Sequence, residues 1–242
     1  MKRSFFLAPV LVVFASCGVF TESNPVVTAQ ESLSGAQALY ASGYAASHHH
    51  LALRSVGSGA TFLPSLCAPL DDQQKADVWS LDLADNALES VPDLSCFSNL
   101  KELNLSYNRL REMPRLDALG SLGVLNVHKN TIATTRGWSA PAGLSVLTMG
   151  YNGVTDLSGL AGLGKLRVLE LQRNAIADVS PLAGLTSLVE LRMEFNVITD
   201  FRPLSALKGL GLLTIAENPG ATPAALQALQ ERNQAYLRAQ GK

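Results

Sequence analysis

Asparagine recurs every 22 residues through the middle of the chain, and this period constrains the fold more than any other feature of the sequence. The series comprises Asn86, Asn108, Asn130, Asn152, Asn174, Asn196 and Asn218. An apolar residue stands eight positions before each of them, namely Val78, Leu100, Leu122, Leu144, Leu166, Leu188 and Leu210. Self-similarity at a fixed period of this length indicates a solenoid built from stacked repeats.

Each repeat begins as a strand and then turns back. In the stretch LRVLELQRN, which ends at Asn174, Leu169 and Leu171 alternate with residues of the opposite face, as a strand with one buried face requires. Stacking places these strands side by side in one parallel sheet. Asn174 stands where the strand ends, and its amide offers donors and an acceptor to backbone groups that have lost their strand partners. The sequence therefore predicts a column of asparagines along the solenoid.

These repeats resemble the leucine-rich repeat family, whose core pattern is LxxLxLxxNxL. The 22-residue length and the segments DVSPL (178–182) and DFRPL (200–204) are similar to the internalin-type subclass. The resemblance implies an α/β solenoid of seven repeats over residues 78–220, with a curved parallel sheet on the concave face and short helical turns on the convex face. The third repeat departs from the pattern, because Thr135 and Trp138 replace apolar residues. We expect a local bulge there.

Residues 1–16 have the features of a secretory signal peptide. Lys2 and Arg3 precede an apolar run over residues 5–15. A bilayer span needs about 20 residues, so this run is too short for a transmembrane helix and suits the core of a signal peptide. Residues 17–60, rich in Ser, Ala and Gly, are predicted to be a flexible tether. Three adjacent histidines in it preset no coordination geometry, so no metal site is predicted.

The end of the apolar run is similar to the lipobox of bacterial lipoproteins. In that motif the signal peptide is cut before a cysteine that carries lipid, and here the sequence is Phe14-Ala15-Ser16-Cys17, with Phe14 where leucine is usual. The resemblance implies lipid on Cys17. Because Gly18 and not aspartate follows, it also implies the outer membrane of a Gram-negative envelope. The alternative is ordinary secretion with cleavage further on, after Ala29.

Both ends of a solenoid expose its core and need caps. Residues 61–77 are the expected amino-terminal cap, and residues 221–242 are the expected helical carboxyl-terminal cap, since Thr222-Pro223 suits a helix N-cap and first turn. An envelope compartment permits a disulfide between Cys67 in the first cap and Cys96 in the first repeat. The alternative is that Cys96 is only a small buried residue, because other repeats have alanine or glycine at its position.

The sequence contains no arrangement of residues typical of a catalytic centre, so we expect neither an enzyme nor a cofactor. Its 19 basic and 20 acidic residues nearly cancel, which gives no reason to expect nucleic acid as a partner. Aspartates recur at one repeat position as Asp156, Asp178 and Asp200. We expect them to cap the following turns, with a cation site as the less favoured alternative.

The residues just before the ladder asparagines predict a binding surface. They are Asp85, Tyr107, Lys129, Tyr151, Arg173, Phe195 and Glu217, and the five central ones alternate between aromatic and basic. Exposed aromatic residues and arginine are typical of protein-binding hot spots. We therefore expect the concave face to bind a macromolecule, a protein, through Tyr107, His128, Lys129, Tyr151, Glu170, Arg173, Arg192 and Phe195. The alternative is that these side chains stack to stabilise a structural envelope component, attached to the membrane by its lipid alone and without a discrete ligand.

Overall fold

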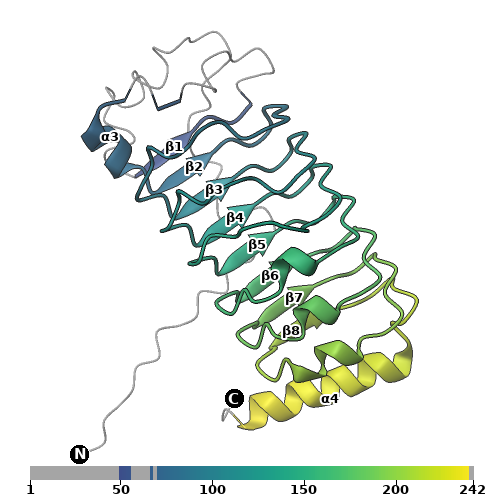
Figure 1. The fold of residues 1–242 in the computed structure, drawn as a ribbon. Helices are drawn as coiled ribbons and strands as arrows, with labels where there is room; N and C mark the ends of the chain where they lie inside the picture. The colour runs from purple at the N-terminus through teal and green to yellow at the C-terminus, as the bar shows by residue number, and fades with distance from the viewer. Residues whose placement is uncertain (1–48, 56–65, 68–69, 240–242) are drawn as a thin grey trace, which may run out of the picture.

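A computed structural model of the protein describes residues 49–55, 66–67 and 70–239. They form a solenoid with one parallel sheet of eight strands in chain order (Figure 1). The strands are β1 (His50–Ala52), β2 (Ser80–Asp82), β3 (Glu102–Asn104), β4 (Val124–Asn126), β5 (Val146–Thr148), β6 (Val168–Glu170), β7 (Glu190–Arg192) and β8 (Leu212–Thr214). The predicted fold class is confirmed. The predicted signal peptide, Cys17 and most of the predicted tether lie outside the described residues.

The repeat period sets the register of the sheet from β2 onward. Leu169 at the centre of β6 lies opposite Leu147 of β5 and Leu191 of β7, and all three side chains are fully buried. The same column of leucines continues along the sheet toward β2, one residue per strand. Because side chains alternate across a strand, the neighbours of these leucines face the opposite, concave side. The concave face is therefore fixed by the same pattern that fixes the core.

The sheet begins one strand earlier than the repeat period predicts. β1 lies within residues 17–60, and it pairs with β2 so that Leu51 is opposite Leu81. Leu51 and Leu53 are buried in the same core as the repeats. The tether prediction is therefore wrong for this segment. The period does not reveal β1 because Leu51 precedes Leu81 by 30 residues, not 22, and Val56 stands where the ladder asparagine would be.

Asn174 shows how the asparagine ladder holds neighbouring repeats together. Its Nδ2 donates to the carbonyl oxygen of Leu171, 2.9 Å away in its own repeat, and to that of Met149, 3.1 Å away in the preceding repeat. Its Oδ1 accepts a hydrogen bond of 3.0 Å from the backbone N–H of Val154. One side chain thus satisfies three backbone groups at the end of the strand, as the sequence predicts.

Short 3-10 helices form in the later return segments. They are η2 (Ser158–Leu160), η3 (Ser180–Leu182) and η4 (Arg202–Ala206). The backbone N–H groups of Ser158, Ser180 and Arg202 donate to the recurring aspartates Asp156, Asp178 and Asp200 at 2.8, 2.8 and 2.9 Å. These aspartates therefore cap the turns, in agreement with the favoured interpretation.

The two ends of the described solenoid carry helices, as Figure 1 shows. α3 (Asp72–Asp77) lies at the amino-terminal end, where Cys67 and Cys96 form a disulfide with their Cα atoms 5.8 Å apart. α4 (Pro223–Ala239) lies beyond β8, and Thr222 Oγ1 accepts a hydrogen bond of 3.2 Å from the N–H of Ala225. The predicted helical carboxyl-terminal cap is confirmed.

In the third repeat, Thr135 and Trp138 depart from the repeat pattern, and their polar groups are hydrogen-bonded. Thr135 is fully buried, and its hydroxyl donates to the backbone oxygen of Asp156 at 3.0 Å and accepts from the N–H of Gly159 at 3.0 Å. A Cβ on Gly159 would lie 1.7 Å from the backbone oxygen of Thr135, so only glycine fits there. Trp138 Nε1 donates to the backbone oxygen of Pro114 at 2.9 Å. Hydrogen bonds thus accommodate the Thr135 hydroxyl and the Trp138 N–H at positions where the repeat pattern has apolar residues.

The core and the ladder make a stability prediction. Leu169→Ala should lower the free energy of unfolding by roughly 2–5 kcal/mol, because it leaves a cavity in a close-packed core. Asn174→Ala should lower it by roughly 1–3 kcal/mol, because it leaves backbone groups unsatisfied. Urea unfolding measures both, with Leu212→Ala as the control, since Leu212 is 38% exposed at the last strand. Equal stability of all four proteins would contradict the register.

Candidate protein-binding face

The residues before the ladder asparagines all adopt a left-handed backbone conformation. Their φ angles lie between 51° and 58° at Asp85, Tyr107, Lys129, Tyr151, Arg173, Phe195 and Glu217. This region favours glycine and, less strongly, asparagine, and it is costly for bulky side chains. The conformation turns the chain inward beyond each strand and leaves the side chain pointing outward. These residues thus line the carboxyl-terminal edge of the sheet and do not belong to the strands themselves.

Five of these side chains form a continuous stack, which we call the aromatic–basic ridge: Tyr107, Lys129, Tyr151, Arg173 and Phe195. Lys129 Nζ lies 4.5 Å from the ring centroid of Tyr107 and 5.3 Å from that of Tyr151. Arg173 Cζ lies 5.2 Å from the ring centroid of Tyr151 and 4.0 Å from that of Phe195. The three rings remain 37%, 41% and 44% exposed. Each cation therefore lies between two rings whose outer surfaces face solvent.

The two cations of the ridge have no carboxylate partner among the described residues. The ion pairs found there involve Lys75, Arg136, Arg192 and Arg202 instead. Lys129 Nζ donates a hydrogen bond of 3.2 Å to the Tyr107 hydroxyl. An incoming carboxylate can therefore pair with Lys129 or Arg173 without displacing an acidic side chain of the described chain.

His128 lies beside the ridge on the concave side. Its ring is 4.9 Å from that of Tyr151, edge to face, and 6.0 Å from that of Tyr107. Burial, and then the positive charge of Lys129, lower the pKa of His128 below its ordinary value of 6.5. The neutral imidazole therefore predominates at pH 7, and His128 contributes a polar aromatic ring and not a charge.

Glu170 and Arg192 lie deeper on the concave face, opposite each other on β6 and β7. The Glu170 side chain is only 2% exposed, so the prediction that it is an open contact residue is wrong. Adjacent side chains at strand spacing cover it, with Gln172 forming a hydrogen bond to its carboxylate and Arg192 Nε lying 3.7 Å from Oε1. Arg192 is 28% exposed and donates a hydrogen bond of 2.5 Å to Glu190.

The structure also brings together an aromatic and basic group that the repeat pattern did not predict. Trp79, which is 42% exposed, stacks on His49 with 4.2 Å between ring centroids, and Lys101 Nζ lies 3.9 Å from the Trp79 ring. Trp79 precedes β2, so this group occupies the amino-terminal edge of the sheet, opposite the ridge. Trp79 and Lys101 are one repeat period apart, but the next two residues at this repeat position are Gly123 and Ser145. The sequence therefore shows no periodic aromatic or basic signal there.

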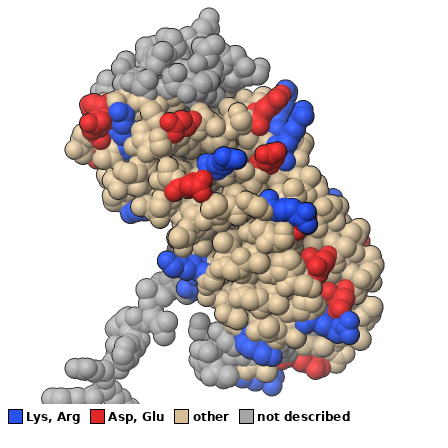
Figure 2. All heavy atoms as spheres, in the orientation of Figure 1, with Lys and Arg blue, Asp and Glu red and all other residues tan. Residues whose placement is uncertain are grey.

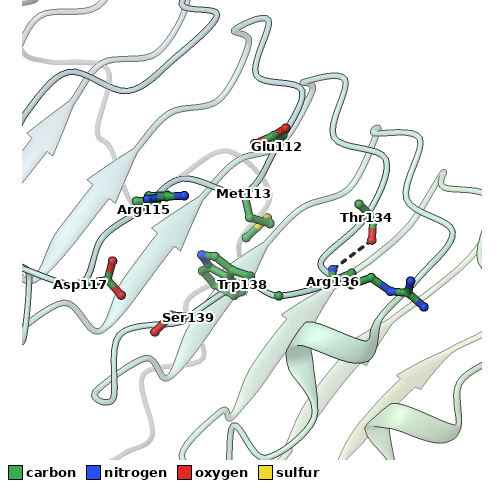
Figure 3. A pocket seen from close by; sticks show the side chains of 9 residues that line it. Glu112, Met113, Arg115, Asp117, Thr134, Arg136, Trp138 and Ser139 are labelled. Atoms are coloured by element: carbon green, nitrogen blue, oxygen red, sulfur yellow. Dashed lines mark hydrogen bonds between the residues drawn. The ribbon is translucent and has the colours of Figure 1, made fainter.

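A cavity of about 450 Å³ lies beside the irregular third repeat (Figure 3). Met113 and Trp138 line it with apolar surface, and Arg115 and Asp117 add charge. Arg136 points away toward Asp156, whose carboxylate is 3.3 Å from its Nε. Within the described ranges, no group of three or more His, Cys, Asp or Glu side chains could hold a metal ion. The cavity lies outside the predicted binding face.

Acidic and basic side chains are scattered over the face of the molecule in Figure 2, several of them next to a side chain of opposite charge. Neither sign forms a broad patch in this view. A field of one sign would steer an oppositely charged partner over long distances. The side of the molecule seen in Figure 2 carries no such broad patch of one sign.

Comparisons with known proteins agree with this architecture. Two family models match, described as Leucine Rich Repeat over residues 99–122 and Leucine Rich repeats (2 copies) over residues 164–208. Internalin C2 from Listeria monocytogenes has a similar structure, with 25% identity, coverage of 66% of this chain and 80% of internalin C2, and a TM-score of 0.50. No curated protein matches the chain.

Two further solved structures share the fold. A Leptospira interrogans leucine-rich repeat protein is 23% identical, with 66% of this chain and 48% of that protein covered and a TM-score of 0.50. The leucine-rich repeat domain of APL1B is 23% identical, with 60% and 43% covered and a TM-score of 0.52. The chain spans less than half of either. The fold is that of a leucine-rich repeat protein, a class of generally non-enzymatic scaffolds that typically mediate protein–protein interactions.

The environment of Glu170 makes a prediction about pH. Burial raises its pKa from 4.5 to about 7, so deprotonation is less favourable in the folded protein than in the unfolded chain. The resulting stability is fully present below pH 4.5 and is lost as the pH rises through 7. Glu170→Gln should therefore exceed the wild type in stability by about 1–3 kcal/mol at pH 8 and by much less at pH 4.

Urea unfolding at the two pH values measures this difference. Glu89→Gln is the matched control, because Glu89 is an exposed carboxyl outside the sheet. If Glu170→Gln differs from the wild type by the same free energy of unfolding at pH 4 and at pH 8, titration of Glu170 does not contribute to the pH dependence of stability.

Proposed function

We propose that the protein is a lipid-anchored component of a bacterial outer membrane that binds a protein partner through its concave face, with the aromatic–basic ridge as the central contact. One observation carries the proposal: tyrosine, lysine, arginine and phenylalanine occupy backbone positions with φ near 55°, where glycine would be unstrained. The fold alone gives no reason for bulky side chains at these positions. A role of these side chains in binding a partner gives such a reason.

The chemistry of the ridge suits a protein partner. Aromatic rings bury a large area with few rotatable bonds, and arginine adds directed hydrogen bonds. Tyr151 remains 41% exposed although Lys129 and Arg173 flank it, so stacking leaves its outer surface available. The competing proposal, a structural component in which the ridge only stabilises the solenoid, is favoured by the same cation–ring contacts. The two proposals predict different effects of removing a ridge side chain: weaker partner binding in the first, and lower stability of the solenoid in the second.

Substitutions in the ridge separate these proposals. Tyr151→Ala and Arg173→Ala should each weaken partner binding by about 2 kcal/mol or more, roughly 30-fold in Kd. Their melting temperatures should change little, because both side chains point outward. The partner is first captured from envelope and host extracts with a bait that includes residues 49–55, since β1 belongs to the sheet. Calorimetric titration then gives the affinities.

Trp79→Ala is the matched control. It removes a ring that is 42% exposed, almost as exposed as Tyr151, from the opposite edge of the sheet. It should leave the affinity unchanged. Lower stability of the two ridge variants with unaltered affinity would instead favour the structural role.

The proposed membrane attachment depends on Cys17. None of the helices in the described part of the chain is long and apolar enough to cross a bilayer. An anchor with two or more acyl chains holds a protein at a membrane stably, whereas one chain holds it only marginally. The lipobox-like sequence that ends at Cys17 supports such an anchor.

Cys17→Ala tests the anchor. The substitution should abolish incorporation of labelled fatty acid and either release the protein from the membrane fraction or leave the uncut precursor. Fractionation and metabolic labelling in a Gram-negative host measure both. A wild-type protein without acyl label, and a variant that partitions with membranes as the wild type does, would contradict lipid attachment.

A further inference from the structure

The row of residues before the ladder asparagines carries four charges in a symmetrical order. The charged residues are Asp85, Lys129, Arg173 and Glu217, which occupy every second position of the row, with an aromatic residue between each pair. All four are exposed, and the ion pairs of the described chain involve none of them. Asp85 accepts a hydrogen bond of 2.7 Å from the Ser55 hydroxyl, which leaves its charge uncompensated. The edge of the sheet therefore presents the sequence of signs minus, plus, plus, minus.

These charges stand at equal intervals along the solenoid and on one side of it. Every member of the row has a φ angle between 51° and 58°, so the side chains leave the successive turns in the same direction. Neighbouring strands lie about 4.8 Å apart, which separates consecutive charges by about 10 Å. The contacts of Tyr151 agree with this interval, because Lys129 Nζ and Arg173 Cζ lie 5.3 and 5.2 Å from its ring centroid.

The rings between the charges leave their edges for a partner. Lys129 and Arg173 lie over the faces of Tyr107, Tyr151 and Phe195, so the exposed parts of these rings are mainly their edges. An aromatic edge carries partial positive charge and is otherwise apolar. A complementary partner therefore has apolar residues between its charged ones, and carboxylates at its centre.

The interval between the charges indicates the backbone conformation of the partner. A polyproline II helix has three residues per turn and rises about 3.1 Å per residue, so residues i and i+3 face one side about 9 Å apart. In a β-strand, residues on one face are separated by about 7 or 13 Å. An α-helix would need roughly 20 residues to reach all four charges. Aromatic-lined surfaces are also typical of polyproline II recognition.

We propose that this row binds a polyproline II segment of the protein partner, with two acidic residues facing Lys129 and Arg173 and a basic residue at each end facing Asp85 and Glu217. The inference rests on the proposed function and specifies the chemistry of its partner. A uniform polyanion such as a nucleic acid is disfavoured, because Asp85 and Glu217 would repel it at both ends of the row. The order of signs is the same from either end, so it accepts either chain direction.

A peptide titration tests the row without the natural partner. The probe is the blocked peptide Lys-Pro-Pro-Asp-Pro-Pro-Asp-Pro-Pro-Lys, whose prolines favour the polyproline II conformation. Its matched control, Asp-Pro-Pro-Lys-Pro-Pro-Lys-Pro-Pro-Asp, has the same composition and net charge with the signs exchanged. In proton–nitrogen spectra of the full chain, the probe should shift the resonances of Lys129 and Arg173, and the control should shift them much less. Lys101, at the opposite edge of the sheet, should respond to neither peptide.

Variants that remove one charge make the test specific to the row. Lys129→Gln and Arg173→Gln should each weaken probe binding about two- to fivefold, as expected for one exposed charge pair. Lys101→Gln is the matched control, because Lys101 also lies over an aromatic ring, that of Trp79, and it should leave the affinity unchanged. Amide spectra verify that each variant is folded.

Several results would overturn the assignment. They are no binding of the probe, equally tight binding of the sign-exchanged peptide, unchanged affinity of both row variants, and tighter binding of a thymidine oligonucleotide than of the probe. If Tyr151→Ala weakens binding of the captured partner but the probe does not bind, the proposed function stands and this inference is wrong. If the probe binds as expected but Tyr151→Ala leaves the captured partner's affinity unchanged, the proposed function is wrong. The two proposals therefore fail separately.

Discussion

The hydrogen bonds of the ladder asparagines are the interaction on which the rest of the structure depends. At each strand end the chain must turn inward, and backbone groups there lose their sheet partners. The side chain of Asn174 satisfies carbonyl oxygens in its own and the preceding repeat and also accepts a bond from Val154. This bonding accompanies a left-handed residue just before the asparagine in every repeat. The outward ridge is therefore a consequence of how the core is closed.

Strand spacing explains why the inner concave face behaves differently from its edge. Neighbouring strands lie about 4.8 Å apart, so side chains in register across the strands touch and cover one another. Glu170 has Thr148 and Arg192 as its neighbours in register, and it is almost completely buried. Beyond the strand ends the chain diverges into turns, and Tyr151 and Phe195 remain more than 40% exposed. Buried charge in the middle and exposed rings at the edge give the face two distinct kinds of contact.

The sequence was sufficient for the features that repeat and insufficient for those that do not. The 22-residue period predicted the leucine column, the asparagine ladder and the register from β2 onward. β1 was not predicted, because its distance from the next strand differs from the period and Val56 stands at its ladder position instead of asparagine. The burial of Glu170 also escaped, because a strand pattern assigns a face but not the crowding by Gln172 and Arg192. Thr135 was recognised as a departure, but the hydrogen bonds that accommodate it depend on Gly159 of the next repeat.

The positive φ of the ridge could not be inferred from residue types. Bulky residues are uncommon in that region, so tyrosine and arginine at these positions predict extended backbone and not a left-handed turn. The bonds of the following asparagine accompany the turn in each of the seven repeats, whatever residue type precedes it. This conflict between local preference and observed conformation occurs at the five positions that carry the aromatic–basic ridge and also outside it, at Asp85 and Glu217 of the same series and at His49, Ser55 and Ala87. Such conflicts are expected where a sequence serves function in addition to folding.

Site-specific photo-crosslinking in intact cells tests most directly whether the ridge is the surface that meets the partner. The photoreactive residue p-benzoylphenylalanine replaces Tyr151 in one protein and Trp79, at the opposite edge of the sheet, in another. The two native rings are 41% and 42% exposed, so accessibility alone does not distinguish them. The account predicts a discrete crosslinked adduct from position 151 and none from position 79. An adduct from position 79 with none from position 151 would contradict it.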